Sequence, residues 1–156
     1  MIPMAIACPL CEKLLNPPGG EVVWQFQQSV AFLGPWQYYT GYCVLVARAH
    51  FTELHQLPVG VRTAFLDEMV ILSQAIATAF QPRKMNCESL GNQVPHLHWH
   101  LFPRSDADNL KPVWLALDHA DHDPKEKLRL QTADLPRAEI IGRLHTTLTQ
   151  MHAPIA

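Results

Sequence analysis

The clearest periodicity in the chain lies between Pro58 and Phe80, where apolar residues recur at spacings of three and four. Such spacing places side chains along one face of a helix. The residues of this face are Val61, Phe65, Met69, Leu72, Ile76 and Phe80. Pro58 stands near the start of the pattern and Pro82 just beyond its end, as is typical of helix boundaries. The pattern predicts one long helix packed against a core.

Short apolar segments rich in β-branched and aromatic residues flank this helix, and such segments are typical of strands. Three precede it: "VVWQF" (22–26), "VAFLG" (30–34) and the nearly continuous apolar "YCVLVA" (42–47). Two follow it: "RKMNCESL" (83–90) and "HLHWHLF" (96–102). The order of three strands, a helix and two strands favours an antiparallel sheet.

The remainder of the chain predicts an extension that ends in a helix. Residues 105–127 are polar, acidic and interrupted by proline, and they indicate a long loop or an added segment. A helix is expected near 136–151, where Ile140, Ile141, Leu144, Leu148 and Met151 share a face. We therefore expect an α+β fold with about five strands, the long helix between strands three and four, and a C-terminal helix. We expect a single domain over 1–156, with its core at about 8–104 and an extension at 105–156.

Composition narrows the classes of function. The chain has 156 residues, a formal net charge of -2 and 17% charged residues, which argue against binding nucleic acid or an anionic membrane surface. No apolar run approaches the roughly 18–20 residues of a spanning helix, and the first residues lack a charged leader and a full apolar signal segment. We expect a cytoplasmic protein whose four cysteines stay reduced.

The stretch "HLHWH" (96–100) carries the strongest chemical signal. Side chains alternate across a strand, so His96, His98 and His100 are expected on one face, with Leu97 and Trp99 on the other. Imidazoles at this spacing can share a metal ion. Alternatively, one imidazole can act as a nucleophile, because its neutral form is well populated near pH 7. Spacing alone leaves both chemistries open.

The surrounding residues resemble the histidine triad (HIT) family of nucleotide hydrolases and transferases. "HLHWHLF" matches its motif, in which three histidines alternate with apolar residues. "GYCVLVARAHFTELHQL" (41–57) is similar to the family's segment before the long helix, and "NCESLGNQVP" (86–95) to its loop before the triad. The resemblance covers about residues 8–104 in the family's order of elements, and it is nearest to the diadenosine polyphosphate hydrolase-like branch.

The resemblance implies a two-step covalent mechanism. His98, the middle histidine, would attack the α-phosphorus of a nucleoside phosphate compound and form a nucleotidyl-histidine. Its other ring nitrogen would keep a proton by donating it to a backbone carbonyl. Water would then release the nucleoside monophosphate, while His100 hydrogen-bonds the phosphate or the bridging oxygen.

The resemblance also assigns substrate-binding residues. Asn86, Asn92 and Gln93 match polar positions of the family loop, where they would contact phosphate oxygens or the ribose. The acidic residue that many members use to hold the ribose hydroxyls has no counterpart in 32–42, which contains no Asp or Glu. Arg104 follows the triad strand, and the expected account of it is a solvent-exposed arginine.

An N-terminal Cys8-Pro-Leu-Cys11 pair has the spacing of half a tetrahedral zinc site, although a redox pair or two idle thiols also fit it. In some branches of the family such a pair combines with the histidine after the third strand and the first histidine of the triad. The resemblance therefore implies a structural zinc ion held by Cys8, Cys11, His50 and His96.

Two further readings stay open from sequence. One is a nucleotide-binding regulatory protein with little turnover, and the other is a metalloenzyme that uses all three triad histidines as ligands. The covalent hydrolase mechanism requires His98 to be free, whereas the metalloenzyme requires it to be bound to metal. The resemblance also implies a homodimer that pairs through the long helix and the adjacent strand.

Overall fold

The computed structural model of the chain describes residues 7–108, 111–113, 124, 128 and 135–156. Most of the polar stretch expected as a loop over 105–127 lies outside the described residues. The described part confirms the α+β fold, with a five-stranded antiparallel sheet, a long helix and a C-terminal helix.

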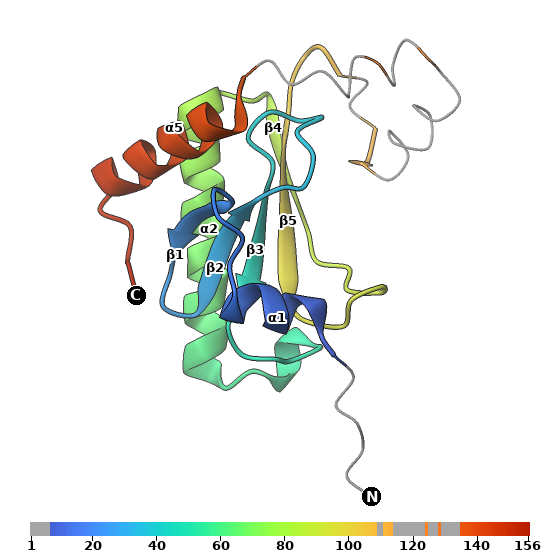
Figure 1. Ribbon diagram of the computed structural model, residues 1–156, viewed down its shortest axis with the longest axis vertical. Coiled ribbons are helices and arrows are strands. Elements are labelled where there is room, and N and C mark those ends of the chain that lie inside the picture. Colours follow the sequence, from blue (N-terminus) through green and yellow to red (C-terminus); the bar gives the residue numbers. More distant parts are fainter. Residues whose placement is uncertain (1–6, 109–110, 114–123, 125–127, 129–134) are drawn as a thin grey trace, which may run out of the picture.

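The sheet has the order β1-β2-β3-β5-β4, with neighbouring strands antiparallel (Figure 1). Its strands are β1 (Val22–Gln25), β2 (Ser29–Leu33), β3 (Cys43–Ala47), β4 (Lys84–Glu88) and β5 (His98–Arg104). The long helix separates β3 from β4 in the sequence, so β5 can insert between those two strands. This order places the triad strand β5 inside the sheet, with a neighbour on each side.

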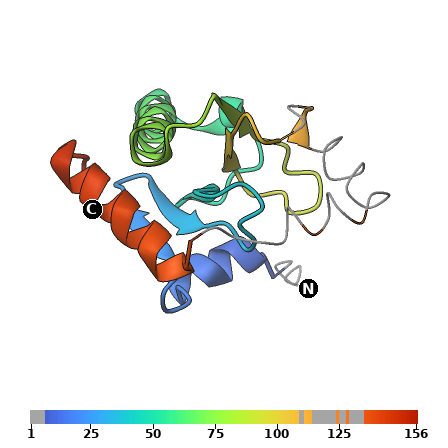
Figure 2. The ribbon, with the colours of Figure 1, turned by 90° about the horizontal axis from the view of Figure 1, so that it is seen from above.

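Among the described residues, the α-helices α1, α2 and α5 lie around the sheet. Helix α2 (Val59–Phe80) follows the short 3-10 helix η1 (Leu54–Gln56) and covers one face, while α1 (Pro9–Leu15) lies across the other (Figure 2). Helix α5 (Arg137–Gln150) packs against α2 and β1. Helix α1 was not predicted, because its seven residues are too few to show a hydrophobic period.

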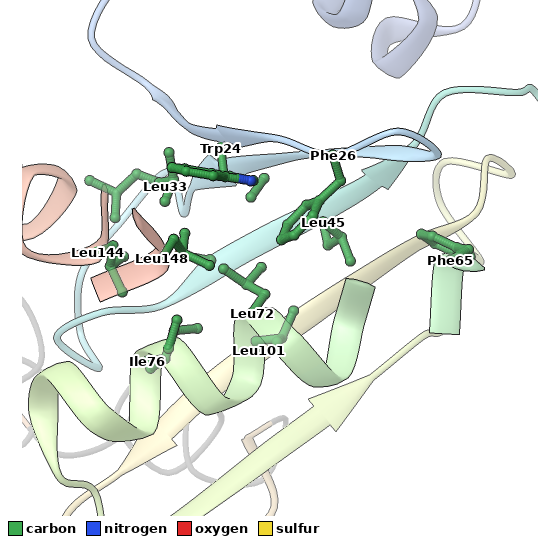
Figure 3. Packing of buried hydrophobic residues seen from close by; sticks show 14 of the residues in the cluster. Trp24, Phe26, Leu33, Leu45, Phe65, Leu72, Ile76, Leu101, Leu144 and Leu148 are labelled. Carbon is green, nitrogen blue, oxygen red and sulfur yellow. The ribbon is translucent and has the colours of Figure 1, made fainter. Parts of the chain in front are cut away.

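The main core lies between the sheet and α2. Leu45 and Leu101 of the sheet meet Leu72 and Ile76 of the helix, and all four side chains are fully buried (Figure 3). Leu144 and its neighbours on α5 join the same cluster. The periodicity expected from the sequence is thus the face that α2 buries. This packing holds the sheet, including β5, against α2.

Helix α2 is long and apolar enough, by length and composition, to cross a membrane, with a mean hydropathy of 1.3 over an 18-residue window. Helix α2 does not form one continuous apolar run in the sequence, because Asp67 and Glu68 interrupt it. Glu68 is buried, and its carboxylate accepts hydrogen bonds from the Gln28 backbone N–H at 2.9 Å and the Ser29 hydroxyl at 2.5 Å. A helix tied to the sheet in this way is the core helix of a globular domain.

The strand boundaries correct one expectation. Strand β5 begins at His98 rather than at residue 96, and it extends to Arg104. His96 therefore precedes the strand, where its ring nitrogen and the backbone of Leu97 bond to residues at the end of β3 and just after it. The change from loop to strand between His96 and His98 therefore sets His96 apart from His98 and His100.

Candidate functional site

Strand β5 presents His98 and His100 on the sheet face opposite to α2. His98 lies across from Val46 of β3, and His100 lies between Val44 of β3 and Glu88 of β4. The two imidazole rings meet edge to face, with centroids 4.9 Å apart. Because residues at alternate strand positions share a face, the two rings can act on one bound group.

His98 is held through one ring nitrogen and leaves the other available. Its Nδ1 lies 2.6 Å from the carbonyl oxygen of His96, and a carbonyl can only accept, so Nδ1 carries the proton. The neutral ring then has a lone pair on Nε2. The Ser89 hydroxyl donates to the carbonyl oxygen of His98 at 2.9 Å, which ties the loop after β4 to this residue. A neutral imidazole with its lone pair on Nε2 can attack an electrophile.

His100 has a different partner. Its Nδ1 lies 2.6 Å from the hydroxyl oxygen of Tyr42, and its ring stacks on Phe102 with centroids 5.8 Å apart. Burial, together with the neighbouring His98, lowers the pKa of His100 to about 4. His100 is therefore neutral near pH 7, and it differs from His98 in what fixes its ring.

Strand β4 adds polar groups beside the histidines. Glu88 pairs in register with His100, and Asn86 pairs with Phe102. Burial raises the pKa of the Glu88 carboxyl, while Arg104 opposes that shift. An acidic group therefore stands beside His100, on a strand outside the stretch 32–42 in which an acidic ribose ligand was expected.

Arg104 was expected to be exposed, and that expectation is wrong. The side chain is 1% exposed, and its guanidinium donates to both carboxylate oxygens of Asp108, from Nε at 3.0 Å and from Nη2 at 2.9 Å. Its Nη1 donates to Oδ1 of Asn86 at 2.8 Å, and the guanidinium lies over the ring of Tyr39. The planar fork needs several acceptors, and the fold supplies them inside the protein. Arg104 thus orients Asn86.

The loop residues Asn92 and Gln93 are placed less closely. Both are exposed in the turn before His96, and within the described part of the chain no hydrogen bond joins them to His98 or His100. A cavity of about 230 Å³ opens beside the loop and reaches His98. Its lining includes Thr52, His55, Ser89, Gly91 and His98. The role of Asn92 and Gln93 in binding substrate stays a prediction.

The structure brings Cys8, Cys11, His50 and His96 together, with their ligand atoms all within 4.8 Å of one another. The Nδ1 atom of His96 lies 3.4 Å from Sγ of Cys8, 3.5 Å from Sγ of Cys11 and 3.1 Å from Nδ1 of His50. The remaining short distance, 3.2 Å, joins Cys11 and His50. Helix α1 supplies Cys11 and Cys8 precedes it, while His50 lies in the loop after β3 and His96 in the approach to β5.

These four short distances, 3.1 to 3.5 Å, are close to those of a tetrahedral metal site. Bonds of about 2.3 Å to sulfur and about 2.0–2.1 Å to nitrogen separate neighbouring ligand atoms by about 3.3–3.8 Å. The Nε2 of His96 donates to the carbonyl oxygen of Ala47 at 2.7 Å, which leaves the Nδ1 lone pair facing the cysteines. Burial lowers the pKa of His96 and keeps it neutral. Burial and the adjacent Cys8 raise the pKa of the Cys11 thiol, an effect that a divalent cation would reverse.

The described residues do not assemble a metal site from the three triad histidines. Among them, the group of histidines, cysteines and acidic residues close enough to share a metal is the Cys8, Cys11, His50 and His96 cluster. His96 faces that cluster, whereas His98 directs Nδ1 to a backbone carbonyl. The geometry therefore favours a division of roles among the three histidines.

Sequence reasoning missed Tyr42, Ser89 and the partners of Arg104. Tyr42 precedes β3 and contacts His100 only because β3 pairs with β5 in the observed register. Ser89 lies in the loop before the triad, which the sequence did indicate. Its hydroxyl donates to a backbone carbonyl, and such a bond leaves no recognisable pattern of side chains in the sequence. Asp108 lies four residues after Arg104, and this spacing was the one signal that could have found the pair.

Comparison with known proteins agrees with the geometry. The sequence profile of the HIT domain matches residues 19–107, which is more than half of the chain. The curated relative named "Protein hit" from Bacillus subtilis (strain 168) is 23% identical over 128 residues, covering 78% of this chain and 87% of the relative.

Solved structures share the fold. A histidine triad protein from Marinobacter aquaeolei VT8 has a TM-score of 0.66 and 24% identity, covering 92% of this chain and 97% of its own. A Zn-bound histidine triad family protein from Mycobacterium smegmatis has a TM-score of 0.64 and 17% identity, covering 94% of this chain and 96% of its own. At these identities the likeness concerns the fold.

Proposed function

The chain belongs to the histidine triad (HIT) domain family, and on this premise we propose that it is a nucleotide hydrolase or nucleotidyl transferase. It cleaves at the α-phosphate of a nucleoside phosphate compound through a covalent nucleotidyl-histidine. The observation that carries the proposal is the bond from His98 Nδ1 to the His96 carbonyl, which leaves Nε2 as the nucleophilic nitrogen.

The chemistry proceeds in two displacements. The Nε2 lone pair of His98 attacks the α-phosphorus, an N–P bond forms, and the bond from phosphorus to the leaving group breaks. His100 hydrogen-bonds a phosphate oxygen or the bridging atom as negative charge develops there. Water then attacks the phosphorus, the N–P bond breaks, and a nucleoside monophosphate leaves with neutral His98 restored. Asn86, Asn92 and Gln93 contact the phosphate or the ribose.

The substrate class follows from this chemistry. Dinucleoside polyphosphates, nucleoside phosphoramidates and adenylylated small molecules all carry an α-phosphorus bonded to a leaving group. Glu88 stands beside His100, so the part of the substrate that lies over β4 meets a carboxyl group. A hydroxyl or an amine there is favoured over a further phosphate, because two anions repel.

A structural zinc ion is the second part of the proposal. Cys8, Cys11, His50 and His96 supply the ligand types of a closed Cys2His2 site, and the cluster is compatible with zinc in its distances. The Mycobacterium smegmatis protein with the same fold is Zn-bound, which supports this assignment. Zinc in such a site joins α1 to the start of β5 and leaves no open position for substrate.

We also propose that two copies form a homodimer in the cytoplasm. Within the part of the chain that the structure describes, β4 is the last strand of the sheet, and we propose that its outer edge pairs with a second β4. On α2, Val70 is 56% exposed, one turn before Ser73, whose hydroxyl contacts Cys87 of β4. An apolar helix face beside an open sheet edge suits a symmetric pair.

The test is release of AMP from adenosine phosphoramidate and from diadenosine polyphosphates. Wild-type protein should turn over at least one of these, and His98→Ala should lower kcat by about 10⁴-fold or more, because it removes the nucleophile. His145→Ala is the matched control, since His145 is exposed on α5 against Trp24. Equal AMP release by wild type and His98→Ala would refute the mechanism. Nucleotide binding without release by the wild type would favour the regulatory reading.

A further inference from the structure

The hydroxyl oxygen of Tyr42 lies 2.6 Å from Nδ1 of His100. Tyr42 is 2% exposed and its ring stacks on Phe102 with centroids 4.4 Å apart, so the phenol cannot swing away. Its oxygen is therefore held against the imidazole by packing on the rest of the ring. A distance this short is that of a strong hydrogen bond.

The direction of that hydrogen bond follows from the supply of acceptors. Burial raises the pKa of the Tyr42 phenol above its ordinary value, so the oxygen keeps its proton. A buried hydroxyl proton needs an acceptor. Within the described part of the chain, His100 Nδ1 is the acceptor that the Tyr42 hydroxyl reaches. If Nδ1 of His100 carried a proton instead, its N–H and the phenol O–H would be two donors facing each other. To avoid this, the phenol would have to turn its proton away from His100.

We propose that Tyr42 is a positioning residue that donates to Nδ1 of His100 and so keeps the His100 proton on Nε2. This inference rests on the proposed nucleotidyl transfer, for which it supplies the donor. His98 is fixed the opposite way, with its proton on Nδ1 and its lone pair on Nε2. The two neighbouring imidazoles therefore present opposite atoms to the substrate, a lone pair from His98 and an N–H from His100.

Opposite tautomers match the two roles that the reaction requires. The attacking nitrogen must be unprotonated, whereas the group that meets the developing negative charge must donate. With the tautomers reversed, His98 could not attack, and His100 would direct a lone pair at phosphate oxygens. A carbonyl and a buried phenol thus give two residues of one motif different chemistry.

The direct test is nitrogen-15 NMR of protein labelled at histidine, with full-length protein at pH 7 to 8. The wild-type spectrum should show His98 protonated at Nδ1 and His100 protonated at Nε2, with a hydrogen-bond shift on His100 Nδ1. Tyr42→Phe removes only the hydroxyl, and the His100 Nδ1 resonance should lose that shift. Tyr39→Phe is the control, since Tyr39 is buried in the same connection and packs on Phe102 without reaching His100. Its spectrum should keep both His signatures.

Kinetics give the second readout. Tyr42→Phe should lower kcat by about tenfold with little change in KM, the size of one hydrogen bond lost from the transition state, while Tyr39→Phe stays within about twofold. A His100 protonated at Nδ1 in the wild type would overturn the proposal. So would an unchanged Nδ1 resonance or an unchanged kcat in Tyr42→Phe. A protein that cleaves none of the nucleotides refutes the proposed function alone, because the tautomers are read without turnover.

Discussion

The carbonyl oxygen of His96 lies 2.6 Å from Nδ1 of His98. The first histidine of the triad thus holds the second with its backbone, while its own ring faces Cys8 and Cys11. His96, a residue of the metal-ligand cluster, and His98, the proposed nucleophile, are therefore two residues apart and joined by this hydrogen bond. Any group that fixes the ring of His96 also fixes the carbonyl that orients His98.

Metal removal should therefore be costly to the fold. We expect about one zinc per chain in wild-type protein and none in Cys11→Ser. The loss of several kcal/mol of metal-binding free energy should lower Tm by about 10 °C or more. Elemental analysis and thermal unfolding measure both. Cys87→Ser, outside the cluster, should keep the metal, and a Cys11→Ser protein with full zinc content would contradict the assignment.

Stability should depend on pH through His100. In the unfolded chain this residue takes up a proton near pH 6.5, whereas in the folded protein its pKa is about 4. Between these values the unfolded state binds more protons, so stability falls as pH drops from about 6.5 to about 4.

Between about pH 6.5 and 4, the free energy of unfolding of His100→Gln should fall by about 2 kcal/mol less than that of wild type. This amount is reduced for the partial exposure of the ring. Urea unfolding from pH 4 to 7, with chelator present throughout, measures the difference without a contribution from metal. His145→Gln, at an exposed position, should keep the wild-type slope. Parallel curves for wild type and His100→Gln would rule out this origin.

Arg104→Lys should destabilise the protein by about 3 kcal/mol, because a lysine cannot bond Asp108 at two points and Asn86 at a third. It should also lower kcat/KM, since Asn86 loses the group that orients its amide. The control is Arg83→Lys, whose ion pair with Asp106 joins side chains 60% and 82% exposed and should change stability by less than about 0.5 kcal/mol. Urea unfolding and steady-state kinetics separate the two variants, and equal losses in both would contradict the role given to Arg104.

Val70→Lys should convert the proposed homodimer to a monomer. The charge would be placed on the apolar face of α2 beside β4, where pairing would bury it at a cost of several kcal/mol. Val59→Lys is matched to it, because Val59 is 68% exposed at the start of the same helix. Light scattering across a concentration series measures the mass of each. Monomeric wild-type protein, or a dimeric Val70→Lys variant, would exclude this interface.

The long helix and the order of the strands along the chain followed from hydrophobic spacing, since α2 buries the predicted face and each predicted strand segment overlaps an observed strand. The metal cluster followed only from resemblance. The spacing of Cys8 and Cys11 indicated half of such a site, but up to 88 positions separate the cysteines from the histidines and no local pattern joins the two pairs. Tyr42 could not have been found this way, because its contact with His100 depends on the pairing register of β3 with β5. Arg104 was misjudged because its contact with Asn86 depends on the pairing of β4 with β5, and the spacing of four residues to Asp108 was overlooked.

The metal cluster also has a consequence for the order of folding. Its residues come from the start of α1, the loop after β3 and the approach to β5, and β3 and β5 must be paired before His50 and His96 meet. Contacts across such sequence separations form late, because a long loop must close first. A metal ion that binds there would therefore bind after β3 and β5 have paired and would not nucleate the fold. Its rate of uptake would report when the sheet is complete.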